Sequence, residues 1–184
     1  MQTTSDVWLF GYGSLVWRPA FDHLERRPAF IDGWARRFWQ GSPDHRGLPE
    51  DPGRVVTLIS APAARCHGVA YRIAADAAAE VFAGLDHRER GGYASLALPV
   101  HFTDPRGEPL GESAEARMYL ATADNPHFLG DAPLPAIAAH IVRCHGPSGA
   151  NLDYLLRLAE ALRELGADDD HVFTLERLAR ALTF

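Results

Sequence analysis

The chain is organised around the stretch Val7-Trp8-Leu9-Phe10-Gly11-Tyr12-Gly13-Ser14-Leu15. Its first four residues are apolar and include β-branched and aromatic side chains, a composition that favours a buried strand. Gly11 and Gly13 then allow backbone conformations that other residues avoid, and a close approach by a ligand. We expect a strand that runs into a loop whose backbone N–H groups hold a carboxylate or an oxyanion. An ordinary tight turn is the alternative interpretation.

Two familiar functional patterns do not fit this loop. The glycine-rich dinucleotide fingerprint needs a third glycine and a following helix, and Pro19 interrupts any helix that starts here. Ser14 stands at a sharp turn, as the nucleophile of a hydrolase does, but no glycine follows it at the required position. A nucleotide cofactor is therefore not expected, and a serine nucleophile is not favoured.

Composition places the chain among ordinary globular proteins. Its 184 residues suit a single domain, residues 1–184, with a core of useful size. The formal net charge is −6 and no basic cluster is present, so nucleic acid is not an expected partner. The arginine pairs at 26–27 and 36–37 are interpreted as solvated surface.

The chain carries no sign of export or of membrane insertion. No apolar run approaches the roughly 18 residues that a membrane span needs, and the first residues do not resemble a secretory signal. With only Cys66 and Cys144, no disulfide framework is expected. These features favour a cytoplasmic protein without a membrane partner.

Strand composition recurs along the first two thirds of the chain. The expected strands are residues 7–10, 29–40, 54–59, 67–73, 93–102 and 114–121. Residues 29–40 form either one bent strand or two short ones, broken near Asp32-Gly33, and residues 61–64 suggest a hairpin-like connection. A polar turn at residues 104–107 joins the last two strands. Residues 41–53, rich in proline, glycine and charge, are expected to form a long functional loop.

Helical patterns separate and then follow these strands. Residues 76–88 are rich in alanine, with Asp76 placed to cap a helix. A second helix starts at residues 133–135, a third is capped by Ser148 or Asn151, and a fourth follows the acidic residues 168–170. The fold class predicted from these elements is α+β: about six mostly antiparallel strands, curled or closed, with helices packed on them.

Glu89 is the one charge in an unexpected place. On a helical wheel it shares a stripe with Phe82 and Leu85, the apolar face of residues 76–88. A carboxylate at an apolar face has its pKa raised by desolvation, which suits a general base working near neutral pH. A salt bridge from Glu89 to a neighbouring arginine is the structural alternative.

A metal site is not expected. The nine histidines show no helical pair at positions i and i+4 with a third ligand nearby. Cys66-His67 and Cys144-His145 are adjacent residues, whose side chains would point to opposite faces of a strand.

Several blocks together resemble one family. Phe10-Gly-Tyr-Gly-Ser-Leu-Val-Trp17 resembles the signature loop of the ChaC family of γ-glutamylcyclotransferases. Further blocks are similar to that family in the same order along nearly the whole chain: residues 36–47, 52–58, 68–72, 85–93, 124–126, 146–149 and 151–155.

The resemblance implies a fold, a reaction and a set of site residues. The implied fold is a small mixed, mostly antiparallel β-barrel with flanking helices. The implied enzyme is a cofactor-free lyase that converts reduced glutathione to 5-oxoproline and cysteinylglycine. The family's catalytic glutamate aligns with Glu89. Its substrate-binding loop falls on Gly11, Tyr12, Gly13, Ser14, Leu15 and Val16.

Other residues receive supporting roles. The segment that contains Gln40, Ser42 and Arg46 is expected to cover the cysteinylglycine half of the substrate. Tyr93 and Tyr119 orient the base or the substrate, or are core tyrosines. Two other functions remain open from the sequence: a cyclotransferase for other γ-glutamyl amines, and a γ-glutamyl-binding module without catalysis.

Overall fold

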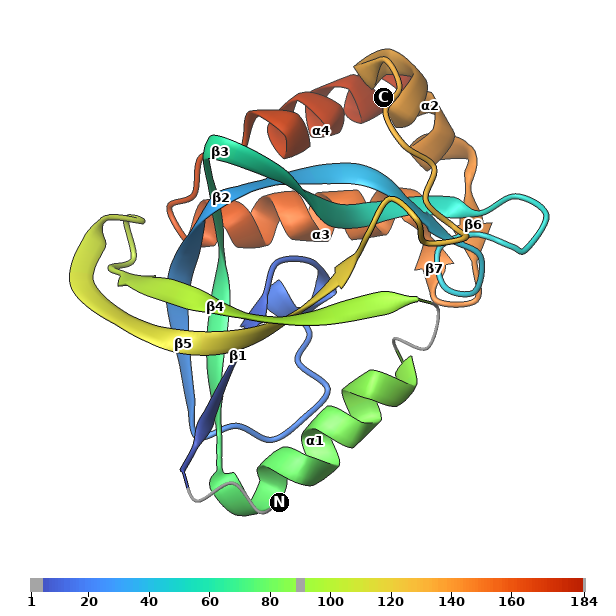
Figure 1. The fold of residues 1–184 in the computed structure, drawn as a ribbon. Helices are drawn as coiled ribbons and strands as arrows, with labels where there is room; N and C mark the ends of the chain where they lie inside the picture. The colour runs from blue at the N-terminus through green and yellow to red at the C-terminus, as the bar shows by residue number, and fades with distance from the viewer. Residues whose placement is uncertain (1–4, 89–91, 184) are drawn as a thin grey trace.

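The structure is a computed structural model that describes residues 5–88 and 92–183, and in this part of the chain five strands close into a barrel (Figure 1). The strands are β1 (Val7–Gly11), β2 (Glu25–Ser42), β3 (Gly53–Ile73), β4 (Tyr93–Thr103) and β5 (Pro109–Ala121). Their order around the barrel is β1-β3-β2-β4-β5. Neighbours are antiparallel except β1 and β5, which are parallel. The predicted fold class, a mixed and mostly antiparallel barrel with helices, is confirmed.

The seams of the barrel differ in length. β2 pairs with β3, and β4 with β5, over most of their residues. By contrast, β1 meets β5 only through residues 8–9 and 116–117, and β2 meets β4 only through residues 29–30 and 101–102. The β4–β5 hairpin therefore closes the barrel through two short contacts.

The helices pack on two sides of this barrel. They are α1 (Ala75–Arg88), α2 (Leu134–Arg143), α3 (Asn151–Glu164) and α4 (Asp170–Thr183). Figure 1 shows α1 on the opposite side of the barrel from the other three helices. One buried cluster joins the barrel interior to α2, α3 and α4, and a second joins α1 to β1, through Phe82, Leu85 and Leu9. No helix in the described ranges is long and apolar enough to span a membrane.

β3 corrects one prediction from the sequence. Residues 54–59 and 67–73 belong to one strand of 21 residues, and both halves pair with β2. β2 is the single bent strand that was one of the two alternatives. Its register passes from the pair Asp32–Arg65 to the pair Trp34–Ser60, so residues 61–64 have no partner in β2. Pro62, which lacks an N–H group, lies in this unpaired part, where a proline costs no ladder bond.

A second irregularity in β2 attaches α4 to the barrel. The register shifts again between Arg37 and Gln40, which leaves Phe38 out of the ladder. Its N–H group donates to Nε2 of His171 on α4 at 3.0 Å, and its carbonyl accepts from Arg54 at 2.8 Å. Burial lowers the pKa of His171 to about 4, so the ring is neutral and free to accept this bond.

The start of α3 corrects a second prediction. Neither proposed residue caps the helix through its side chain. The Asn151 amide instead accepts from the Arg54 N–H at 2.7 Å and donates to the Arg54 carbonyl at 2.8 Å, while the Ser148 hydroxyl meets the His45 ring at 3.0 Å. Asn151 therefore holds the beginning of β3 against α3. The expected long loop is present as residues 43–52, between β2 and β3.

Arg36 corrects the interpretation of the arginine pairs as solvated surface. Its side chain points into the protein, and only 2 % of the residue is exposed. The guanidinium donates to Tyr12 O at 2.9 Å, to Asp169 Oδ2 at 2.6 Å and to the carbonyl of His67. Burial opposes its charge, but neighbouring negative groups outweigh burial and the pKa of Arg36 is raised. Because burial raises the pKa of the Cys66 thiol to about 11, Asp169 supplies the counter-charge at neutral pH.

The neutral His171 makes stability depend on pH. The unfolded chain binds a proton at the ordinary histidine pKa of 6.5, whereas the folded protein does so only near pH 4. The free energy of unfolding therefore falls as the pH drops from 6.5 toward 4, by up to about 3 kcal/mol at about 1.4 kcal/mol per pKa unit.

His171→Gln keeps an acceptor for Phe38 but cannot titrate. We expect its free energy of unfolding, measured by urea titration between pH 4 and 7, to vary less with pH than that of the unaltered protein. His145→Gln, at an exposed position, is the control and should keep the original pH dependence. Equal slopes for all three proteins would contradict this assignment.

Candidate active site

A cavity of about 620 Å³ opens beside the loop that follows β1. It is lined by most of the residues that the sequence singled out: residues 11–15, Gln40, Ser42, Arg46, Tyr93 and Tyr119. These residues come from β1, from the end of β2 with its loop, and from the β4–β5 hairpin. Val16 does not line the cavity, because it is fully buried in the core.

The loop after β1 presents N–H groups to this cavity. Its carbonyls are held on the protein side, since Tyr12 O accepts from Arg36 and Leu15 O accepts from the Tyr71 hydroxyl at 2.6 Å. The short 3-10 helix η1 (Ser14–Val16) begins with the bond from Val16 N to Gly13 O. Within the described residues, the N–H groups of 13, 14 and 15 have no hydrogen-bond acceptor. Three successive donors beside a cavity are suited to a negatively charged oxygen.

The two glycines of the loop are required by close packing. Neither has a positive φ, but Gly13 lies at φ −116° and ψ −128°, outside the main regions that other residues favour, as expected. A Cβ atom on Gly11 would lie 2.6 Å from the Cβ of Leu15, and one on Gly13 would lie 3.0 Å from the Tyr154 hydroxyl. Any side chain at these positions would displace the loop or narrow the cavity.

Gln40 forms another part of the wall and is bonded to Asn125, which does not line the cavity. Gln40 is 1 % exposed, and its Nε2 donates to Asn125 Oδ1 at 3.1 Å. Asn125 Oδ1 also accepts from the N–H of His127, which fixes it as an acceptor and Gln40 Nε2 as the donor. Gln40 Oε1 is buried without a hydrogen-bond partner among the described atoms. An unsatisfied buried acceptor next to a cavity is suited to a ligand N–H group.

Tyr119 connects the barrel wall to α1. Its hydroxyl donates to Asp86 Oδ1 at 2.6 Å, and its carbonyl accepts from the Tyr12 hydroxyl at 2.8 Å. Burial, reinforced by the Asp86 carboxylate, raises the pKa of Tyr119 to about 12. Tyr119 therefore stays protonated at neutral pH and holds α1 and the loop in register.

Positive charge gathers where the β2–β3 loop meets the cavity. The backbone N–H of Arg46 donates to Ser42 Oγ at 3.0 Å, and its guanidinium donates to the Ala150 carbonyl at 3.1 Å. Burial lowers the pKa of Arg46, but an arginine keeps its charge in proteins. Arg18 lines the same cavity, where Asp44 is the one carboxylate among the lining residues that the structure describes. This side of the cavity favours an anionic ligand.

Glu89 lies outside the described residues, so its predicted position is not tested. Residues on both sides of Glu89 in the sequence, Leu85 of α1 and Tyr93 of β4, line the cavity. Phe82 and Leu85, the other members of its helical stripe, are buried as expected. Gly92 lies beside Asn125, since a Cβ on it would be 3.0 Å from Asn125 Nδ2.

Two residues of the site had no role predicted from the sequence. Tyr154 lines the cavity and Asn125 is bonded to Gln40, and both stand in blocks that resemble the family, residues 151–155 and 124–126. Their positions at the site come from packing of elements that are distant in the chain, so no periodic pattern indicates what each side chain does. Arg36 holds the loop without lining the cavity. It was interpreted as solvated surface because it forms a pair with Arg37 in the sequence.

Comparisons with known proteins agree over almost the whole chain. The family model described as ChaC-like protein matches residues 7–182. The human protein named glutathione-specific gamma-glutamylcyclotransferase 1 is 44 % identical over 170 residues, covering 90 % of this chain and 75 % of the human one. A Saccharomyces cerevisiae protein named glutathione-specific gamma-glutamylcyclotransferase is 36 % identical, covering 92 % of this chain and 94 % of its own.

Solved structures agree in fold. A crystal structure of a yeast γ-glutamyl cyclotransferase specific to glutathione matches with a TM-score of 0.88 and 32 % identity, covering 97 % of both chains. Sequence and fold thus match over the same residues that build the barrel, the loop and the cavity. The chain belongs to the ChaC-like family.

Proposed function

We propose that this protein cleaves reduced glutathione to 5-oxoproline and cysteinylglycine, as a glutathione-specific γ-glutamylcyclotransferase. The observation that carries the proposal is the lining of the cavity. It includes three N–H groups without an acceptor among the described residues, and Leu85 and Tyr93, which lie on either side of Glu89 in the sequence. The names of the human and yeast relatives support the same substrate and reaction.

The reaction needs no enzyme nucleophile. The α-amine of the γ-glutamyl group attacks the γ-carbonyl carbon of the same group, and a five-membered lactam forms. The amide bond to cysteine breaks, and the departing nitrogen takes up a proton. Holding the amine against the carbonyl is an orientation effect, for which a shaped cavity is suited. Both reacting groups belong to the substrate, so the proposal includes no cofactor.

Glu89 is the proposed proton carrier. Only the free amine attacks, so a base must first accept a proton from the ammonium group, and the same group can return it to the leaving nitrogen. Tyr119 is excluded from the role of base by its pKa of about 12. The position of Leu85 and Tyr93 at the cavity supports Glu89, which lies between them in the sequence.

The loop after β1 is proposed to bind the negative end of the γ-glutamyl group. The N–H groups of residues 13–15 suit either its α-carboxylate or the oxyanion that develops on the γ-carbonyl. Gln40 Oε1, the unpaired buried acceptor, is suited to the amine or to the amide N–H of the substrate. Arg46 and Arg18 are placed to attract the carboxylate of the cysteinylglycine half.

A cytoplasmic location is part of the proposal. Cys66 and Cys144 are both free thiols in the structure, as expected for a reducing compartment. Reduced glutathione requires the same conditions.

The purified protein should convert reduced glutathione without added metal or nucleotide. We expect 5-oxoproline and cysteinylglycine to appear in equal amounts, followed by mass spectrometry. γ-Glutamylalanine, which lacks the cysteinylglycine half, is the comparison substrate and should be turned over more slowly. Binding of glutathione without either product would contradict the proposal.

Glu89→Gln should remove most turnover, because the amide cannot accept the proton. General acid–base catalysis contributes roughly 10²- to 10⁴-fold, so we expect kcat to fall within this range while glutathione still binds. Glu80→Gln, at an exposed position of α1, is the matched control and should keep normal kcat. Near-normal turnover in Glu89→Gln would rule out this role.

Gly13→Ala should weaken substrate binding, because the added Cβ meets the Tyr154 hydroxyl at 3.0 Å and shifts the N–H groups. We expect KM for glutathione to rise about tenfold, equivalent to about 1.4 kcal/mol. Gly84→Ala on α1 is the control, since its Cβ would meet nothing within 4 Å. An unchanged KM in Gly13→Ala would show that the loop does not hold the substrate.

A further inference from the structure

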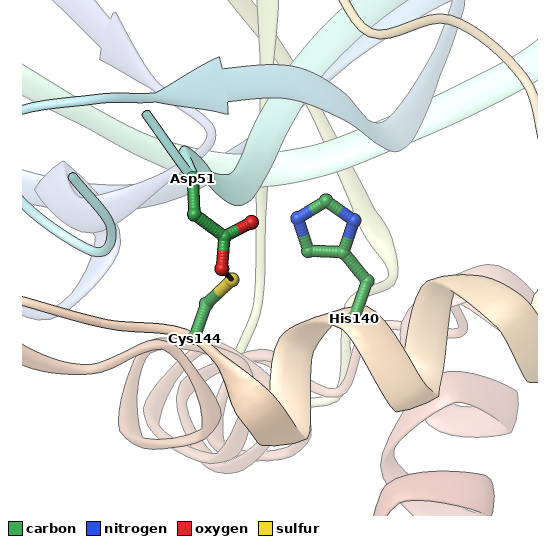
Figure 2. A group of neighbouring side chains, drawn as sticks. All are labelled: Asp51, His140 and Cys144. Atoms are coloured by element: carbon green, nitrogen blue, oxygen red, sulfur yellow. Dashed lines mark hydrogen bonds between the residues drawn. The ribbon is translucent and has the colours of Figure 1, made fainter. Parts of the chain in front are cut away.

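Three metal-ligating side chains meet outside the cavity: Asp51, His140 and Cys144 (Figure 2). Each offers a different donor, a carboxylate oxygen, an imidazole nitrogen and a sulfur, and these atoms lie within 4.8 Å of one another. None of the three residues lines the cavity. The proposed reaction therefore leaves this group without a role.

The fold brings the three residues together from two elements. His140 and Cys144 are four residues apart at the end of α2, so their side chains lie on the same face. Asp51 belongs to the β2–β3 loop, where its backbone pairs with Leu48 in both directions. The adjacent pair Cys144-His145 hides the spacing of four residues between Cys144 and His140.

The distances suit a small tetrahedral cation. Cys144 Sγ lies 3.7 Å from Asp51 Oδ2 and 3.8 Å from the carbonyl oxygen of Pro52. In a tetrahedral zinc site, with bonds of about 2.3 Å to sulfur and about 2.1 Å to nitrogen or oxygen, neighbouring ligand atoms are about 3.4 to 3.6 Å apart. His140 Nε2 now donates to the Pro52 carbonyl at 2.8 Å, so coordination through Nε2 requires the tautomer with its proton on Nδ1 and a slight movement away from this carbonyl.

The surroundings prepare these donors. Arg143 binds the other carboxylate oxygen of Asp51, Oδ1, at 2.8 Å, so Oδ2 remains directed toward Cys144. Such outer contacts orient ligands in metal sites.

We propose that Asp51, His140 and Cys144 bind a zinc-like divalent cation, with a water molecule or the Pro52 carbonyl as the fourth ligand. Thiolate and imidazole donors favour zinc over magnesium or calcium. The cation replaces the thiol proton of Cys144, which is released to solvent.

The site would join the β2–β3 loop to α2. Residues 43–46 at the start of this loop line the cavity, and its end is packed tightly against them. A Cβ on Gly53 would lie 2.4 Å from the carbonyl oxygen of Arg46. A cation that holds Asp51 therefore stabilises the wall that carries Arg46, without taking part in the chemistry.

The test uses untagged full-length protein freed of metal by a chelator. We expect one equivalent of Co²⁺ to give the visible bands of tetrahedral cobalt and a near-ultraviolet thiolate band, and Zn²⁺ to displace it. Zn²⁺ should also raise the melting temperature and release protons. Asp51→Asn, at an exposed position, should weaken Zn²⁺ binding by at least about tenfold. Cys144→Ser should abolish the thiolate band.

Two controls separate this site from other donors. Cys66→Ala removes the other thiol and His145→Gln removes the adjacent imidazole, and both should bind Co²⁺ as the unaltered protein does. The melting temperature without metal shows whether each variant is folded. The proposal is overturned if the unaltered protein gives no tetrahedral cobalt spectrum, or if that spectrum and the affinity for Zn²⁺ survive in Asp51→Asn and Cys144→Ser.

Discussion

The buried guanidinium of Arg36 is the interaction on which the site depends. A charge removed from water must be paired and hydrogen-bonded, and Arg36 meets this requirement through Tyr12, His67 and Asp169. These partners belong to the loop after β1, to β3 and to the segment before α4. Arg36 thus fixes the Tyr12 carbonyl, as the Tyr71 hydroxyl fixes the Leu15 carbonyl, and the N–H side of the loop is left for a ligand.

Most helices and strands could be predicted from local sequence patterns, because these patterns depend on residues that are close together in the chain. The strands other than the break at residues 61–64, the polar turn near Asp104 and the helices α1 to α4 were predicted correctly. The connection at residues 61–64 was wrong, because proline and small residues mark a break in local structure whether or not both flanks pair with the same strand. Which strand is the partner depends on contacts that no local window contains.

The site was predictable to the extent that it lies on contiguous sequence. The glycine pattern pointed to the loop after β1, and the supporting roles expected for residues 40–46, Tyr93 and Tyr119 fall on residues that line the same cavity. Arg36, Asn125 and Tyr154 stand in blocks that resemble the family, but their roles were missed because they depend on partners far away in the chain. The contact between Asp51 and His140 could not be predicted for the same reason, since about 90 residues separate them.

The two short strand pairings beside the β4–β5 hairpin, β1 with β5 and β2 with β4, determine where the barrel opens. Two residue pairs on each side hold the hairpin to the remaining strands, whereas the hairpin is paired internally along most of its length. Local opening follows the boundaries with the fewest hydrogen bonds. The barrel is therefore expected to open first along these two short pairings, while Tyr119, bonded to Asp86 and to the Tyr12 hydroxyl, keeps the hairpin attached to α1 and to the loop after β1.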